Sequence, residues 1–170
     1  MSLVQVATNT VSSAVSGVIL TGIDSDDVYM VAFNNVVGAT NNVGLQIQLT
    51  KSGTAQSDSE YDYAYKNLRT DTTFSDTSGT NQTAISLGNT GTATSESSQG
   101  IIYLYNFNSS SEYSFFTNET CHFNATPFLT GAQGGIMHTV ASASDGVNFK
   151  MSSGNIDSGT FTLFKVIWYE

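Results

Sequence analysis

Histidine, cysteine and carboxylate side chains are the groups in this chain that could do chemistry. The sequence has two histidines, His122 and His138, and one cysteine, Cys121. A nucleophilic mechanism needs a base beside the nucleophile and a third group that orients the base. Cys121 and His122 are consecutive, and consecutive side chains of a strand point to opposite faces, so they do not predict a Cys–His pair. We expect both histidines to be hydrogen-bonded and half-buried in strands, and we predict no enzyme activity.

The acidic run DSDD is the strongest metal candidate. Asp24, Asp26 and Asp27 fall between two expected strands, and carboxylate oxygens in a turn suit calcium. The run lacks the ligand spacing of an EF-hand loop, and the alternative of a solvated turn is favoured. A zinc site is less supported, because one cysteine and two histidines need a carboxylate or a second subunit to complete the ligands. No cofactor is predicted.

The segment SDSEYDYAYKNL could act on a glycan in two ways, by binding it or by cleaving it. Tyr61, Tyr63 and Tyr65 share one face of an expected strand, where they could form an aromatic platform for a sugar. Core packing or a subunit contact uses the same residue type and is favoured. The interleaved carboxylates could serve a glycosidase, which needs a pair of them in a cleft. These carboxylates are Asp58, Glu60 and Asp62.

The elements that would position these groups are strands. Val43, Leu45, Ile47 and Leu49 alternate with polar residues or glycine, which predicts a half-buried strand. Residues 28–33 are apolar on both faces and predict a central strand. Similar short runs recur, separated by Gly, Asn, Ser and Asp, which is typical of a sandwich or barrel. The stretch of about residues 70–98 is irregular, and only AISLG in it resembles core.

We therefore predict an all-β chain, an antiparallel β-sandwich of jelly-roll type, with residues 1–170 forming a single domain. Charged residues are only 11% of the chain and the net charge is −9, with five Lys and Arg in all. So few basic residues cannot neutralise phosphates, which argues against nucleic-acid and anionic-membrane binding. The N-terminus has no basic region followed by an apolar run, so we expect no signal peptide and folding in a cytoplasm.

The last expected strand is apolar on both faces. Phe161 and Leu163 share one face, and Phe164, Val166 and Trp168 occupy the other. We expect the first pair to face the core. The second group then needs a cover, and we predict that another subunit provides it, with Trp168 as the anchor.

Several segments together resemble a family of small β-rich virion proteins of tailed bacteriophages, particularly marine ones. They are GIDSDDVYMVAFNNVVGATNNVGLQIQLTKSG, EYDYAYKNL and NFKMSSGNIDSGTFTLF, so the resemblance covers about residues 17–66 and 146–165. It implies a structural component of the virion, such as a head decoration or a tail- or fibre-associated protein. Such proteins assemble as symmetric copies, and we expect a trimer that contacts other virion proteins. The family supplies no catalytic residues.

Two other functions stay open from the sequence. One is a module of the same particle that recognises a glycan of the host surface, through the tyrosine face or the long loop. The weaker one is a glycan-cleaving enzyme.

Overall fold

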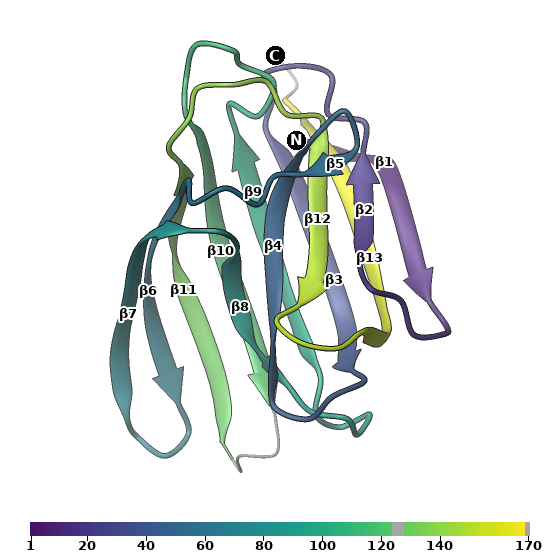
Figure 1. Cartoon of the computed structure of the whole chain (residues 1–170), viewed down its shortest axis with the longest axis vertical. Helices are drawn as coiled ribbons and strands as arrows, with labels where there is room; N and C mark the ends of the chain where they lie inside the picture. The colour runs from purple at the N-terminus through teal and green to yellow at the C-terminus, as the bar shows by residue number, and fades with distance from the viewer. Residues whose placement is uncertain (124–127, 169–170) are drawn as a thin grey trace.

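The computed structural model describes residues 1–123 and 128–168, and these residues form strands, turns and loops without a helix. The described part therefore offers no helix that could cross a membrane. Its strands pair in antiparallel fashion and build two sheets that pack face to face (Figure 1). The prediction of an all-β sandwich is confirmed.

The larger sheet has eight strands and forms the back layer in Figure 1. In spatial order these are β1 (Ser2–Val11), β13 (Ile156–Ile167), β3 (Tyr29–Gly38), β9 (Ser98–Tyr105), β10 (Ser114–Phe123), β11 (Leu129–His138), β6 (Tyr61–Arg69) and β7 (Phe74–Gln82). The two ends of the chain lie side by side, because Ser2 pairs with Ile167.

The smaller sheet lies in front of one half of the larger one. Its strands are β2 (Val18–Thr21), β12 (Gly146–Met151), β4 (Val43–Lys51) and β5 (Thr54–Ala55), and β8 (Ile85–Thr90) also pairs with β4. Since β5 and β8 pair with opposite ends of β4, β8 forms the edge of this sheet along its lower part.

The connectivity is that of a jelly roll. β1 and β3 both pair with β13, β2 and β4 both pair with β12, β9 pairs with β3, and β8 pairs with β4. Early strands thus pair with late ones, and the two layers β1-β13-β3-β9 and β2-β12-β4-β8 form the double sheet of this fold.

Two insertions extend the larger layer. β6 and β7 come between β4 and β8, and β10 and β11 come between β9 and β12. We call β10, β11, β6 and β7 the wing.

The core fills the space between the two layers. Phe149 of β12 packs against Phe33 and Phe161 of the larger sheet, with ring centroids 5.8 and 4.9 Å away. All three side chains are at most 2% exposed. Fully burying one such side chain is worth about 1.5–3 kcal/mol, so this aromatic cluster is a main source of stability.

Most of the strands match the sequence patterns. Val43, Leu45, Ile47 and Leu49 all join the core, as the alternation predicts. The polar face of β4 is less exposed than expected, since Gln48 is 2% exposed and donates to the Thr83 carbonyl, 2.8 Å away. In residues 70–98, β7 is an exposed edge strand and β8 carries the AISLG core residues, also as predicted.

Candidate functional site

The acidic turn at residues 24–27 holds a lysine ammonium. Lys165 Nζ lies 2.8 Å from Asp27 Oδ2, 3.7 Å from Asp24 Oδ1 and 2.9 Å from Ser25 Oγ. The Tyr29 hydroxyl, 2.8 Å away, donates to Asp24 and, together with Lys165, holds the pKa of that carboxyl below its usual range. The hydrogen bond from Lys165 likewise lowers the pKa of Asp27. Lys165, a residue of the same chain, therefore supplies the positive charge beside Asp24 and Asp27.

The predicted calcium ligands therefore do not form a calcium cage. Asp24 and Asp27 share Lys165, and within residues 1–123 and 128–168 no three His, Cys, Asp or Glu side chains converge in a way that could hold a metal ion. Lys165 lies on the last strand, 138 positions or more beyond the turn in sequence, so the local pattern did not reveal it.

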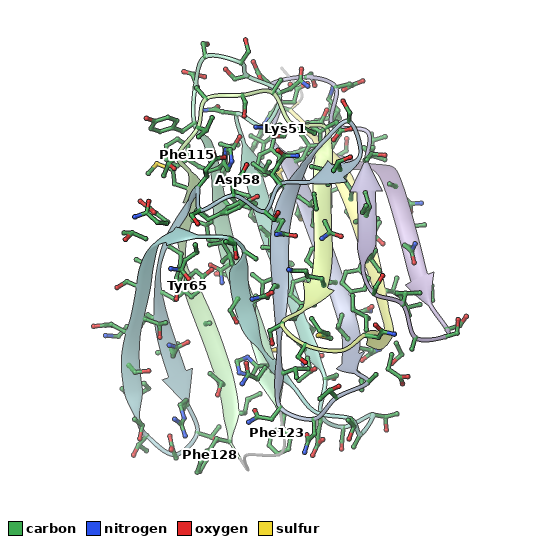
Figure 2. All side chains as sticks on the ribbon, viewed as in Figure 1. Lys51, Asp58, Tyr65, Phe115, Phe123 and Phe128 are labelled. Carbon is green, nitrogen blue, oxygen red and sulfur yellow. The ribbon has the colours of Figure 1, made fainter. Side chains whose placement is uncertain are left out.

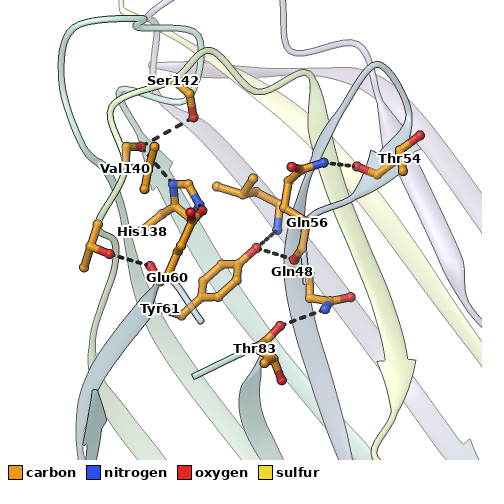
Figure 3. Close-up of polar contacts among 11 residues, drawn as sticks. Gln48, Thr54, Gln56, Glu60, Tyr61, Thr83, His138, Val140 and Ser142 are labelled. Atoms are coloured by element: carbon orange, nitrogen blue, oxygen red, sulfur yellow. Dashed lines mark hydrogen bonds and ion pairs between the residues drawn. The ribbon is translucent and has the colours of Figure 1, made fainter. Parts of the chain in front are cut away.

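His138 is fully buried at the end of the wing, where both ring nitrogens have a partner (Figure 3). Nδ1 donates to the Val140 carbonyl over 3.0 Å, and Nε2 lies 3.1 Å from Glu60 Oε2. Burial lowers the pKa of His138 and the charge of Lys51 adds to this, while Val140 and Glu60 act in the opposite direction. With both nitrogens engaged, the ring has none left to activate a hydroxyl or a water.

Two of the three interleaved carboxylates have structural partners. Glu60 holds His138, whereas Asp62 accepts the backbone N–H of Asn81 at the sheet edge, over 2.9 Å. Glu60 and Asp62 are thus each bound to a different part of the fold.

Cys121 and His122 point to opposite faces of β10, as the strand geometry predicts. Cys121 accepts a hydrogen bond from Gln99 Nε2 on the outer face, at 3.7 Å. His122 points inward and is only 9% exposed, and its Nδ1 has no hydrogen-bond partner among the described residues. The expectation of a half-buried, hydrogen-bonded histidine is wrong for His122, because β8 covers it: the ring lies against Gly88.

The tyrosine row faces inward and cannot be an exposed platform. Tyr61 is fully buried; its hydroxyl accepts the Leu49 N–H over 3.1 Å and donates to the Gln56 carbonyl over 2.9 Å (Figure 3). Tyr65 is 8% exposed, and its ring centroid is 4.9 Å from that of Tyr63. The tyrosines share a face, as predicted, and Tyr61 and Tyr65 are buried on it.

The side chains of β13 face the core or the opposite side as the sequence predicts at the start of the strand, but the prediction fails at its end. Phe161 and Leu163 are fully buried in the core, and Phe164 is half-buried on the opposite face. Val166 was expected to need another subunit, yet it is only 2% exposed within this chain. Trp168, after the end of β13, is 66% exposed. The expected patch is thus reduced to Phe164 and Trp168.

Phe164 belongs to a wider apolar surface on the larger sheet, which we call the outer face. Strand pairing places Phe164, Met30 and Tyr103 in one row across β13, β3 and β9. The next rows mix apolar side chains with charged and amide ones, including Glu119, Gln133, Lys66 and Asp76, from β9 to β7. The apolar side chains are Tyr105, Phe115, Met137, Ile101, Leu68 and Phe74, with Ile101, Phe115, Leu68 and Phe74 exposed by 39% to 63%. The sequence pattern groups such residues only within single strands, because it does not contain the pairing between strands.

A concave region lies on the inner side of the wing. The smaller sheet ends at β8, and beyond it β6, β7 and β11 form one wall of a cleft of about 270 Å³. Tyr65 of β6 lines this cleft and lies close to β8 in the view of Figure 2. His122 and Gly88 line the same cleft.

No protein-family model, curated protein or solved structure matches this chain. The resemblance to virion proteins of tailed bacteriophages thus stays a prediction. The fold and the outer face are the features of this chain that bear on its function.

Proposed function

We propose that this chain is a non-enzymatic structural protein of a tailed-phage virion, a decoration or a tail- or fibre-associated subunit that assembles with copies of itself as a trimer. The observation that carries the proposal is the apolar outer face. A sheet face in contact with water is ordinarily polar, and contiguous apolar patches on a soluble protein mark interaction surfaces. Here the outer face carries aromatic, aliphatic and methionine side chains from β13 to β7.

A second copy of the chain is the partner that this surface favours. The chain has a net charge of −9, and like charges across an interface oppose association. The outer face largely avoids that cost, because its charged side chains are few and most of them form ion pairs or hydrogen bonds. Lys66 and Asp76 form an ion pair with 2.8 Å between Nζ and Oδ1, and Glu119 accepts from Gln133 over 2.8 Å. Aromatic side chains and methionine, which interfaces favour, supply the remaining contact area.

The fold and the sequence resemblance point to the same function. Jelly rolls occur in viral capsid and lectin domains among others, and the resemblance in residues 17–66 and 146–165 is to virion components. This support is by analogy, whereas the outer face is an observation on this chain. A protein with this role works in the particle, after folding in the host cytoplasm.

Sedimentation velocity at micromolar concentration tests the assembly. We expect a trimer for the native chain and a shift towards monomer for Phe115→Asp, which places a charge among the exposed apolar side chains of the outer face. The matched control is Ile19→Asp on the smaller sheet, where the side chain is 47% exposed. The control should keep the oligomer and the melting temperature. A native chain that sediments as a monomer would contradict self-assembly through this face.

Immunogold labelling of purified particles tests the location. Labelled virions support the structural role, and a particle preparation free of the protein contradicts it. Trp168→Ala sharpens the result, because a 66%-exposed indole contributes little to the folded monomer but can anchor an interface. We expect reduced incorporation into particles with an unchanged melting curve.

Host-glycan recognition through an exposed aromatic platform is not supported, because Tyr61 and Tyr65 are buried.

A further inference from the structure

The outer face of the wing contains an apolar groove of about 580 Å³. One of its walls is a row that strand pairing forms from Phe115, Met137 and Asp62, and Phe115 lies towards the top of Figure 2. Short side chains from β10, β11, β6 and β7 form the floor. They are Thr117, Gly135, Ala64 and Ser78, which pair in one row. A Cβ on Gly135 would meet no atom of the described residues within 4 Å, so the groove is open at its floor.

The size and lining of this groove suit an aromatic side chain. Its volume of about 580 Å³ lies within the roughly 300–1,000 Å³ of pockets that hold ligands. Phe115 is 41% exposed and Met137 is half-buried, so both present apolar surface to the groove. A phenyl ring and a thioether sulfur both make favourable contacts with a further aromatic ring.

Trp168 is an aromatic side chain that lacks a cover. Among the aromatic residues that the structure describes it is the most exposed, at 66%, and it is the only tryptophan of the sequence. Tryptophan is enriched among the few residues that carry most of the energy of an interface. An indole held in water at the end of a strand therefore fits an anchor for another surface.

The indole cannot reach the groove of its own chain. Trp168 directly follows β13, and β3, β9 and β10 separate that strand from β11, which carries Gly135 and Met137. Neighbouring strands lie about 4.8 Å apart, so four steps across the sheet amount to roughly 19 Å. One residue beyond the end of β13 cannot span that distance. An indole that enters the groove has to come from a second copy.

The polar group at the groove matches the polar group of the indole. Asp62 Oδ1 accepts the Asn81 N–H over 2.9 Å, which leaves Oδ2 without a donor among the described residues. The indole N–H is a donor and usually finds an acceptor when it is buried. Asp62 is the single charged side chain in the described lining, so little like-charge repulsion opposes a second acidic copy there.

We propose that Trp168 of one copy inserts into this groove of the next copy, with its ring against Phe115 and Met137 and its N–H bonded to Asp62. The inference rests on the self-assembly proposed above and names the contact that carries it. The indole and the groove are different parts of the chain, so the contact is head-to-tail. Contacts of that kind close into rings, and a trimer is one such ring.

The fluorescence of the native chain tests the insertion directly, because Trp168 is its only tryptophan. Dilution from the oligomer to the monomer, followed by sedimentation velocity on the same samples, should move the emission to longer wavelength and increase quenching by acrylamide. An oligomer whose indole emits and is quenched like that of the monomer overturns the insertion, while the proposed assembly stands. A chain that is monomeric at every concentration overturns both.

Gly135→Leu tests the groove without removing a contact of the monomer. The new side chain fills the floor, so the association constant should fall on the order of thirtyfold, as for the loss of an interface anchor. The melting temperature of the monomer should not change. Trp168→Ala should weaken association to a similar extent, and combining the two changes should add little, because both remove the same contact.

The matched control is Gly131→Leu, on the same strand and the same face but outside the groove. A Cβ there would lie 3.8 Å from the Thr120 carbonyl oxygen and 4.0 Å from that of Leu68, which are ordinary contact distances. The control should leave association and indole emission unchanged. The proposal is overturned if Gly135→Leu associates like the native chain, or if Gly131→Leu weakens association as much as Gly135→Leu does.

Discussion

The covered half of the larger sheet and its wing differ along a single row of side chains. On β13, β3 and β9, under the smaller sheet, the inward row holds Phe161, Phe33 and Gly100. On β10, β11, β6 and β7 it continues with Thr120, Ala132, Asn67 and Ser75. Along this row the larger sheet thus changes from aromatic to mostly polar side chains as its cover ends. The facing layer decides whether a position of this row belongs to the apolar core.

Tyr61 and Tyr65 show the same difference within one strand. Tyr61 has both a donor and an acceptor for its hydroxyl, whereas the Tyr65 hydroxyl has neither among the residues that the structure describes. Burial raises the pKa of both phenols, so both are neutral at physiological pH. A satisfied polar group stabilises the fold, and an unsatisfied one weakens it unless a ligand or water is bound.

The covered half should be by far the more sensitive to truncation. Phe149→Ala removes a fully buried ring from the contact with Phe33 and Phe161 and should lower the free energy of unfolding by about 3–5 kcal/mol. Phe115→Ala on the outer face, 41% exposed, should change it by about 0.5 kcal/mol or less at a protein concentration where the chain is monomeric. Urea unfolding measures both. Equal losses would show that the outer face is part of the core.

The two tyrosines provide a finer test of the same comparison. Tyr61→Phe leaves the Leu49 N–H buried without a partner and should cost about 1–3 kcal/mol. Tyr65→Phe removes a buried hydroxyl that has no partner within residues 1–123 and 128–168, and it should leave stability unchanged or raise it. Thermal melts compare the two variants. A larger loss for Tyr65→Phe than for Tyr61→Phe would mean that tightly bound water satisfies the Tyr65 hydroxyl.

The wing should also make stability depend on pH. His122 has a folded-state pKa below the usual 6.5 because it is buried, so the unfolded chain binds a proton first as the pH falls below 6.5. Stability is full above that pH and declines below it, by up to about 1.4 kcal/mol per pH unit for one histidine. His122→Gln should reduce the slope between pH 6.5 and 5, and His138 supplies the remainder. An unchanged slope in urea unfolding would exclude His122 as a source.

The acidic turn should produce the smallest effect. Its carboxylates are exposed, and ion pairs in contact with water are strongly screened, so Lys165→Gln should shift the melting temperature only slightly. Chelator should cause no shift, because Lys165 already occupies the place between Asp24 and Asp27. A clear loss of melting temperature in chelator that disappears in Asp26→Ala would establish a calcium site despite the lysine.

The sequence by itself determined the strands and the direction of their side chains. Alternation at Val43–Leu49 placed that row in the core, and the two-faced run at residues 28–33 became the central strand β3, because side-chain period and burial are local properties of a strand. It also placed Tyr61, Tyr63 and Tyr65 on one face. The site residues that it proposed for metal and for a glycan platform depended on what lies opposite them, which no local pattern contains.

Tertiary structure decided those partners, since a jelly roll pairs strands that are far apart in the chain. It brought Lys165 to the acidic turn, covered Val166 within the monomer and joined Phe164 to the outer face. It also ended the smaller sheet at β8, which left His122 and Tyr65 in a cleft with unpaired polar atoms. Burial of a side chain is a property of the surface that faces it, and in this fold that surface comes from a distant part of the sequence.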